Sequence, residues 1–590
     1  MGKMRPPEPG PFEGHPDGYC PAARGVVSGG HLTARGTTRR ALALLTNPAA
    51  TAEQRAEAFT CLDTVAAAQI ETDRPGDRRG RRGTWFWLGA GATGFRPDLN
   101  FADFIGNDLL ELLRNDTVPD HADWPAGLLD LVTEGLRRAV DCSMRRRVRV
   151  SYTNPMAMSV TMCARTGERL GVPEYVEFAR ERLDEWTAFT DRAGGFEEFN
   201  SNTYAGVTLL HTATLAELAK DDDIREKALY MERQYLDHVI EFYHRPTGET
   251  CMPRSRAYHD HFAGTLLHGY LCRAVARLRP AAVFDPAWEP KPSHLPVYCH
   301  ATEEQLDCLL TSPSDPRQVR RFVEWIGQDH VGPLDQAPDA GGDGTRRREI
   351  TAYLHPEFCI GSVSEIDSWS QRRALGGYVR TDRGAAMVSW RPEIEVAGCE
   401  SGELDRLWPA QMLFNLCTGQ VGSTVLAGVS TMPVDGGWLC GSHWRQKVSG
   451  AIDGVTIDLG FDIEGAVRDD PPEAGVPWEV ELGACAFTLL FIGGTDAAPA
   501  VRRTETGVRV TLLRRDDVTV DWSDPPRPGL AFVAGLAPRG EGPNLGAASW
   551  EVDGTRFRCS AEADGRRLRL VYDPPGIDDL TSRACFFIAD

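Results

Sequence analysis

The sequence predicts an α+β protein with a helical first half and a second half of antiparallel strands. Apolar residues recur at spacings of three and four up to about residue 326, and short alternating runs begin at about residue 349. The chain has 590 residues, which is too long for a single ordinary core. We therefore expect an irregular arm over residues 1–37, a helical domain over 38–345 and a β domain over 346–590.

The helical half should contain nine helices, each with an apolar stripe that can pack against its neighbours. Residues suited to a helix start, such as Thr51, Asn154 and Asp222, precede or open these stretches. The predicted ranges are Ala52–Thr72, Phe101–Arg114, Trp124–Arg145, Pro155–Leu170, Pro173–Arg192, Gly206–Ala219, Ile224–Phe242, Phe262–Leu278 and Glu303–Ile326.

The second half is predicted to form an antiparallel β-sandwich. Its alternating runs, such as Val455–Phe461 and Val508–Arg514, follow one another without helical patterns between them, which disfavours a parallel sheet. The pairs Asp553-Gly554 and Asp564-Gly565 fit tight hairpin turns between such runs.

Polar breaks recur along the helical half at a nearly constant spacing. Asn100, Tyr152, Tyr204 and Tyr258 fall 52, 52 and 54 residues apart, each at or near the start of a helical run. One helical hairpin consumes about 50 residues when its helices have about 20 residues and its loops are short. These four side chains should therefore lie at the same end of successive hairpins, at one mouth of a ring.

Composition argues against two classes of partner. The formal net charge is −20, whereas a nucleic-acid-binding surface needs a basic face. No stretch approaches the roughly 20 apolar residues of a membrane span. We expect neither nucleic acid nor a membrane as a partner, and the chain leaves open whether it forms a homo-oligomer.

Cysteine usage and the N-terminal segment predict a cytoplasmic protein. The 15 cysteines show no CxxC pair, and residues from Met1 to Arg35 lack the apolar core of a secretory signal. His259 and His261 lie too close in sequence for a helix-borne metal pair, so we expect neither a metal nor another cofactor.

Two polar segments are candidates for chemistry. The first runs from Phe196 to Tyr204 and holds Glu198, Asn200 and Asn202 just before an apolar helix, which is more than helix capping needs. The second runs from Arg254 to His261 and concentrates Arg256, Tyr258, His259 and His261. Tyrosine and histidine carry protons, and a nearby guanidinium stabilises a phenolate or a carboxylate.

A third candidate, His355, lies where the helical half gives way to strands. Domain junctions form clefts, so this histidine is expected to reach the ring mouth from the β side.

Three motifs, in this order ahead of a β domain, resemble heparinase II/III-type and alginate-lyase-like polysaccharide lyases. They are Tyr152-Thr-Asn154-Pro, Glu198-Phe-Asn-Ser-Asn-Thr-Tyr204 and Ser255-Arg-Ala-Tyr258. The resemblance implies an incomplete (α/α)5-6 toroid followed by an antiparallel sandwich. It also implies β-elimination on a uronic-acid-containing glycan.

The resemblance assigns the roles residue by residue. The family's asparagine falls on Asn202 or Asn200, its catalytic tyrosine on Tyr258 and its sandwich histidine on His355. Asn202, helped by Arg256 or a histidine, would donate to the substrate carboxylate, and Tyr258 would move the proton. The remaining candidates are assigned to substrate binding: Asn200, Tyr204, Glu198, Tyr152, Asn154, His259 and His261.

The sequence departs from the family at one position, because Thr203 follows Asn202 where several of these lyases have histidine. His259, His261 or His211 would have to replace it. Three other functions stay open: a glycoside hydrolase using carboxyls such as Glu197, Glu198 and Asp260, an intracellular elimination or cyclisation enzyme of small-molecule biosynthesis on the same scaffold, and a sugar-binding protein without activity.

Overall fold

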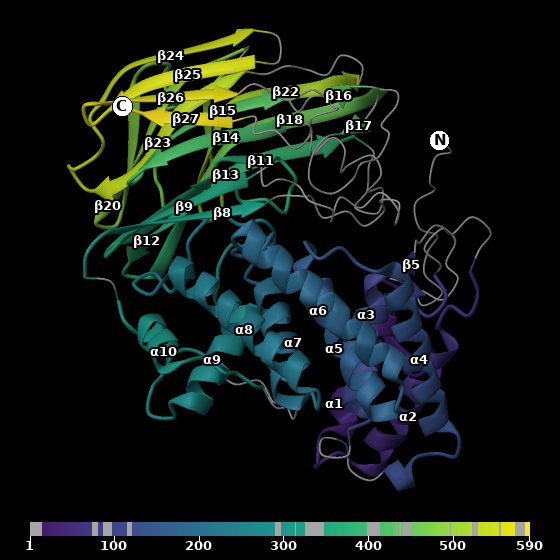
Figure 1. Ribbon diagram of the computed structural model, residues 1–590. Coiled ribbons are helices and arrows are strands. Elements are labelled where there is room, and N and C mark those ends of the chain that lie inside the picture. Colours follow the sequence, from purple (N-terminus) through teal and green to yellow (C-terminus); the bar gives the residue numbers. More distant parts are fainter. Residues whose placement is uncertain are drawn as a thin grey trace.

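The computed structural model places a helical domain before a domain of stacked sheets (Figure 1). It describes residues 15–73, 81–86, 97–114, 118, 121–289, 297–312, 314–324, 347–397, 414–431, 434–435, 438–439, 451–495, 497–521, 529–553, 556–572 and 585–590. The last described helix ends at Leu310, and long strands follow from Arg317, which confirms the α+β prediction.

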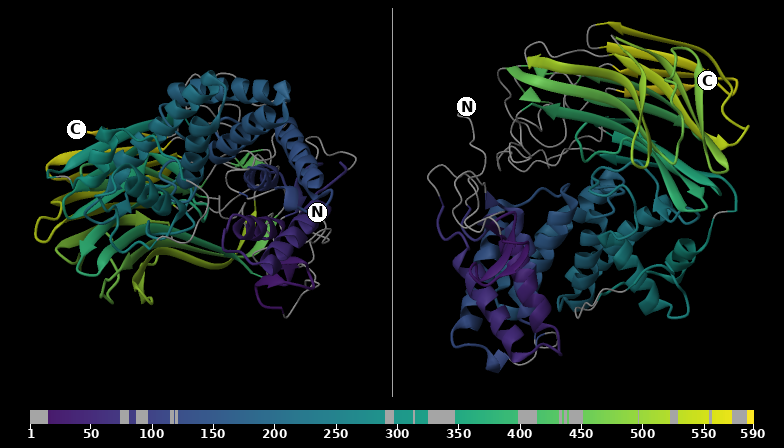
Figure 2. Two further views of the ribbon diagram at one scale, coloured as in Figure 1. Left: turned by 90° about the horizontal axis from the view of Figure 1, so that it is seen from below. Right: turned by 180° about the vertical axis from the view of Figure 1, so that it is seen from behind.

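The helices pack as hairpins in two layers. Helices α1, α3, α5, α7 and α9 contact one another in succession, while α2 contacts α4, and α8 contacts both α6 and α10. Seen from below, they follow a curved row (Figure 2, left). The bounds are α1 (Ala34–Leu45), α2 (Ala52–Ala67), α3 (Asn100–Leu112), α4 (Leu128–Arg146), α5 (Thr153–Leu170), α6 (Pro173–Ala193), α7 (Tyr204–Leu218), α8 (Asp222–Phe242), α9 (Leu266–Leu278) and α10 (Glu303–Leu310).

Two stretches differ from the sequence prediction. Helix α10 ends at Leu310, and Arg317–Glu324 is strand β8, so the predicted helix through Ile326 is wrong in its second half. Val319 and Val323 are four residues apart, a spacing that places them on one face of a helix and of a strand alike. The predicted irregular arm is also wrong in part, because Gly18–Leu32 holds the small sheet β1–β3 and α1 begins at Ala34.

The described residues of the second domain form three larger antiparallel sheets and a two-stranded sheet of β16 (Val434–Asp435) and β17 (Trp438–Leu439). The first has eight strands in the order β21-β22-β18-β13-β12-β10-β9-β8, the second six in the order β11-β14-β15-β23-β20-β19, and the third four in the order β24-β25-β26-β27. Their bounds are β9 (Arg347–His355), β10 (Phe358–Val363), β11 (Glu365–Asp367), β12 (Leu375–Thr381), β13 (Gly384–Val396), β14 (Phe414–Val421), β15 (Thr424–Thr431), β18 (Ala451–Glu464), β19 (Pro477–Leu482), β20 (Cys485–Gly494), β21 (Ala500–Arg503), β22 (Gly507–Asp521), β23 (Leu530–Pro538), β24 (Leu545–Asp553), β25 (Arg556–Ala563), β26 (Arg566–Tyr572) and β27 (Cys585–Ala589).

The hairpin prediction at Asp564-Gly565 is confirmed. Both residues have positive φ, at 52° and 74°, and they join β25 to β26. Gly554, in the other predicted turn, lies outside the described residues.

The third sheet adds a layer to the expected two-sheet sandwich. One core fills the space between the eight-stranded and six-stranded sheets, and a second joins the six-stranded sheet to β25 and β26. The central strands β15 and β23 are therefore covered on both faces. At Gly428 in β15, an added Cβ would lie 2.1 Å from the Phe557 ring, so glycine leaves room for the third sheet.

We expect Gly428→Ala to lower the free energy of unfolding by about 1–3 kcal/mol, because the new methyl group overpacks this contact. Denaturant unfolding measures the change. Gly269→Ala in α9 is the matched control, since an added Cβ there meets no atom within 4 Å. It should leave stability unchanged or raise it by about 0.5–1 kcal/mol. Equal stability of Gly428→Ala and wild type would contradict the packing of the third sheet.

The helical domain and the eight-stranded sheet share one core. Phe199, Phe242 and Met252 of the first domain pack with the residues of β10 and β12. A Cβ at Gly361 would lie 1.8 Å from the Met252 carbonyl oxygen, and one at Gly376 would lie 2.5 Å from the Met252 sulfur. These two glycines allow the segment after β7 (Glu249–Thr250) to lie directly on the sheet.

Candidate active site

Three tyrosines from successive helical hairpins meet at the guanidinium of Arg256. Its Nη1 donates to the Tyr152 hydroxyl at 3.3 Å, and its Nη2 donates to the hydroxyls of Tyr204 at 3.2 Å and Tyr258 at 3.1 Å. The Tyr204 and Tyr258 hydroxyls are 2.8 Å apart and share a hydrogen bond. Of the four residues expected to converge at one end of the hairpins, the three tyrosines do so.

The fold brings these tyrosines together because alternate helices form the inner layer. Tyr152 is the N-cap of α5, Tyr204 is the first residue of α7, and Tyr258 precedes α9. Asn100 likewise begins α3, but its side chain accepts from Arg146 Nη2 at 2.5 Å instead of joining Arg256.

Glu198 lies beside the Arg256 guanidinium and is itself held by Asn154. Both Glu198 carboxylate oxygens accept from the Asn154 amide at 2.8 Å, and one lies 3.5 Å from Arg256 Nη1. The Asn154 backbone N–H adds a bond of 2.7 Å to the same carboxylate. Glu198 and Asn154 are buried, so we assign them to the orientation of Arg256 and not to contact with a substrate.

The sheet domain completes the surroundings of Arg256. The Gln371 side-chain oxygen accepts from Arg256 Nε at 3.2 Å and from Nη2 at 3.1 Å, and the Trp369 ring lies 5.3 Å from the guanidinium. Both residues belong to the loop between β11 and β12. Sequence reasoning missed them because they lie more than 100 residues from Arg256 and carry no local motif.

The members of this cluster differ in exposure. Tyr258 is 50% exposed, whereas Tyr152 and Arg256 are buried. Burial raises the pKa of Tyr152 to about 12 and that of Tyr204 well above its ordinary value, although Arg256 opposes both shifts. Burial disfavours the charged form of Arg256, yet the tyrosines and Glu198 hold its pKa above the ordinary value. Tyr258 is thus the exposed tyrosine of the cluster, and its hydroxyl lies beside a permanent cation.

Asn202 lies outside this cluster, although the resemblance implies that it acts on the substrate carboxylate together with Arg256 and Tyr258. Its side-chain amide lies 2.5 Å from Thr250 Oγ1. When the amide oxygen and nitrogen exchange places, the nitrogen donates to Thr250 Oγ1 and the oxygen accepts from Arg254 Nη2 at 3.2 Å. Asn200 is also buried and donates to the Pro253 carbonyl at 2.9 Å. Both amides fasten the loop before α7 to the segment around Arg254.

His355 does not contact the Arg256 cluster within the described residues. It ends β9, its Nδ1 accepts from the Glu357 N–H at 3.2 Å, and its ring stacks on Phe358 at 4.6 Å. The expected reach of His355 to the mouth is therefore wrong, because the β9–β10 turn holds its ring. His259 is exposed beside Tyr258, and His211 lies within α7 with a pKa lowered to about 3 by burial and nearby arginines.

Asp260 and His261 hold the loop that contains Tyr258 against the sheet domain. The Asp260 carboxylate accepts from Arg373 Nε at 2.9 Å and also from Arg391. His261 bridges Glu249 of the helical domain, at 2.8 Å, and Glu464 of β18, at 3.1 Å. Hydrogen bonds to these two carboxylates raise the pKa of His261 to about 10, so its imidazolium links the domains at neutral pH.

We expect His261→Gln to lower the melting temperature more at about pH 6 than at about pH 10. The pKa of His261 is about 10 in the fold, compared with about 6.5 for a free histidine. A raised histidine pKa stabilises the fold fully below the unfolded value, and the stabilisation is lost as pH rises through the folded value.

Thermal melts of both proteins across this pH range measure the difference. His259→Gln is the matched control, because that ring is exposed and has no charged partner among the described residues. A difference between His261→Gln and wild type that is the same at every pH would contradict the imidazolium bridge.

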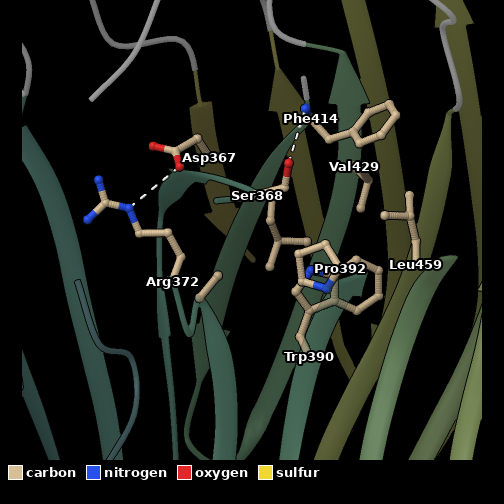
Figure 3. Close-up of a pocket in the computed structure, with 10 residues that line it drawn as sticks. Asp367, Ser368, Arg372, Trp390, Pro392, Phe414, Val429 and Leu459 are labelled. Atoms are coloured by element: carbon tan, nitrogen blue, oxygen red, sulfur yellow. Dashed lines mark hydrogen bonds and ion pairs between the residues drawn. The ribbon is translucent and has the colours of Figure 1, made fainter. Parts of the chain in front are cut away.

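A small cavity lies between the two larger sheets, beside the loop after β11 (Figure 3). Its walls are mainly apolar, and the ion pair between Arg372 Nε and Asp367, at 3.5 Å, lies at one side. The lining residues are Asp367, Ser368, Arg372, Ala374, Trp390, Pro392, Phe414, Leu416, Val429 and Leu459. None of the tyrosines that contact Arg256 lines this cavity, so we interpret it as a packing gap and not as the active site.

Within the ranges given above, no three His, Cys, Asp or Glu side chains gather in a way that would hold a metal ion. No described helix combines the length and apolar character of a membrane span.

Comparisons with known proteins identify one matching family and several similar solved structures. A family described as a domain of unknown function (DUF8769) matches residues 97–265, a range that includes Tyr152, Tyr204, Arg256 and Tyr258. No curated protein matches the sequence.

Similar solved structures include the chondroitin AC lyase of Streptomyces coelicolor A3, with 11% identity and a TM-score of 0.38 over 92% of this chain and 84% of the lyase. A heparinase III has 10% identity and a TM-score of 0.36 over 91% and 83% of the two chains. The heparan sulfate lyase HepC of Pedobacter heparinus has 8% identity and a TM-score of 0.36 over 84% and 74%.

Proposed function

We propose that this protein is a carbon–oxygen lyase that cleaves a uronic-acid-containing glycan by β-elimination, with Tyr258 as the proton carrier. One observation carries the proposal. The hydroxyl of Tyr258, a half-exposed residue, lies 3.1 Å from a buried guanidinium and 2.8 Å from a second tyrosine hydroxyl. This arrangement stabilises a phenolate, because both neighbours donate hydrogen bonds to its oxygen.

The reaction assigns a step to each group. The Tyr258 phenolate removes the proton α to the substrate carboxylate, and a carbon–carbon double bond forms as the glycosidic C–O bond breaks. The phenol then returns its proton to the leaving oxygen. Arg256 and Tyr204 donate to the phenolate before the transfer, and Glu198 and Gln371 hold Arg256 in place.

The carboxyl groups of the site fit hydrolysis less well. A glycoside hydrolase needs two carboxyls flanking the scissile bond. Glu198 is fully engaged by Asn154 and Arg256, and Asp260 is held by two arginines. Glu197 is 1% exposed, and burial raises its pKa to about 8 despite the nearby Arg372. The partners of Glu198 and Asp260 and the burial of Glu197 therefore favour structural roles over a role in hydrolysis.

The test is a panel of uronate-containing polymers, oligosaccharides and small glycosides, followed by ultraviolet absorbance for a new double bond conjugated to the carboxylate. Elimination by the wild type supports the proposal, and the active members of the panel separate polymeric from small substrates. Release of reducing ends without new absorbance would instead indicate a hydrolase. Binding without turnover would indicate a sugar-binding protein.

A further inference from the structure

Gln371 presents an amide of known orientation beside Tyr258. Its oxygen accepts from Arg256 Nε at 3.2 Å and from Nη2 at 3.1 Å. A guanidinium has only donors, so the oxygen of this amide must face Arg256 and its NH2 group must face elsewhere. Arg256 Nη2 also donates to Tyr258 at 3.1 Å, which places the Gln371 side chain and the Tyr258 hydroxyl around the same nitrogen.

The backbone fixes Gln371 in this position. The Ala257 N–H, between Arg256 and Tyr258, donates to the Gln371 carbonyl at 2.8 Å. Arg254 and Arg373 exchange backbone hydrogen bonds of 2.8 Å and 3.1 Å, so the two loops run antiparallel across the domain junction. Gln371 therefore cannot shift along the site without breaking these bonds.

The NH2 group of Gln371 is available to a ligand. The residue is partly exposed, and no described protein group accepts a hydrogen bond from its side-chain nitrogen. An amide whose oxygen already binds a cation is polarised, so its N–H groups become stronger donors. Asn202, to which the sequence assigned the donor role, is buried against Thr250 and does not fill it.

We propose that the Gln371 amide nitrogen binds the carboxylate of the acidic sugar and stabilises the enediolate that forms when Tyr258 removes the adjacent proton. This inference rests on the proposed function and names the substrate group recognised at that site. The amide oxygen orients Arg256 while the nitrogen holds the substrate. One side chain thus couples the position of the carboxylate to the position of the base.

Gln371→Glu tests the inference with little change in shape. A glutamate keeps the oxygen that accepts from Arg256, but it replaces the donor by a charge that repels a carboxylate. We expect kcat/KM for a uronate oligosaccharide to fall by about 100-fold or more. In the Tyr258→Phe background, affinity for the same oligosaccharide should fall by about tenfold or more. With a methyl-esterified substrate, which carries no charge, the loss in affinity should be smaller.

The matched control is Gln54→Glu in α2, which makes the same change at a capping-box position where glutamate also fits. It should leave all three measurements unchanged. Unchanged affinity and turnover in a folded Gln371→Glu protein would overturn the inference while leaving Tyr258-dependent elimination intact. If the wild-type protein catalyses no elimination, the proposed function is rejected. If Gln371→Glu nevertheless binds the oligosaccharide more weakly than the wild type does, carboxylate recognition by Gln371 is still supported.

Discussion

Tyr258→Phe is expected to lower kcat by about 100-fold or more while leaving the affinity for substrate nearly unchanged. Phenylalanine keeps the ring and its contact with Tyr204, whose centroid lies 5.7 Å away, but removes the hydroxyl assigned to move the proton. Tyr258 is 50% exposed, so the substitution opens no core cavity and the melting temperature should stay within a few degrees of wild type. Steady-state kinetics by ultraviolet absorbance and oligosaccharide titration measure the two effects separately.

Tyr230→Phe is the matched control for Tyr258→Phe. Tyr230 is 38% exposed on α8, and its hydroxyl donates to Asp191 at 2.6 Å, away from the Arg256 cluster. Its removal should leave kcat unchanged. Elimination by Tyr258→Phe at nearly the wild-type rate would reject Tyr258 as the proton carrier.

Arg256→Lys is expected to lower kcat by about 100-fold, although the positive charge is retained. A lysine ammonium lacks the planar fork that donates to Tyr204, Tyr258 and Gln371 at once. The charge still faces the buried Glu198, so the protein should remain folded. Steady-state kinetics measure the change in kcat, and thermal melts show whether the variant is folded.

The double variant shows whether Arg256 acts through Tyr258. In the Tyr258→Phe background, Arg256→Lys should slow the residual reaction by no more than about threefold, because the group that it serves is already gone. Arg380→Lys provides the control, since Arg380 forms a surface ion pair of 2.7 Å with Glu357. Independent, additive losses would contradict a shared action of Arg256 and Tyr258.

Part of the candidate site could be predicted from the chain because it rests on local order. The spacing of Tyr152, Tyr204 and Tyr258 reports the length of one helical hairpin, and side chains at the same end of neighbouring hairpins must lie close together. Arg256 joins them because it is two residues from Tyr258. Asn202 and His355 could not be placed in this way, since a polar residue near a helix start or a junction has several partners available. The bonds to Thr250 and Phe358 were decided in three dimensions.

The sequence by itself determined the helical and antiparallel halves, the hairpin period and the meeting of three tyrosines, because periodicity records which face of an element is buried. It does not record what covers that face. Only the tertiary structure decided that Val319 and Val323 belong to a strand, that a third sheet covers β15, and that Gln371 completes the site. Each of these depends on contacts between segments far apart in the chain, and the energy of such contacts leaves no period in the sequence.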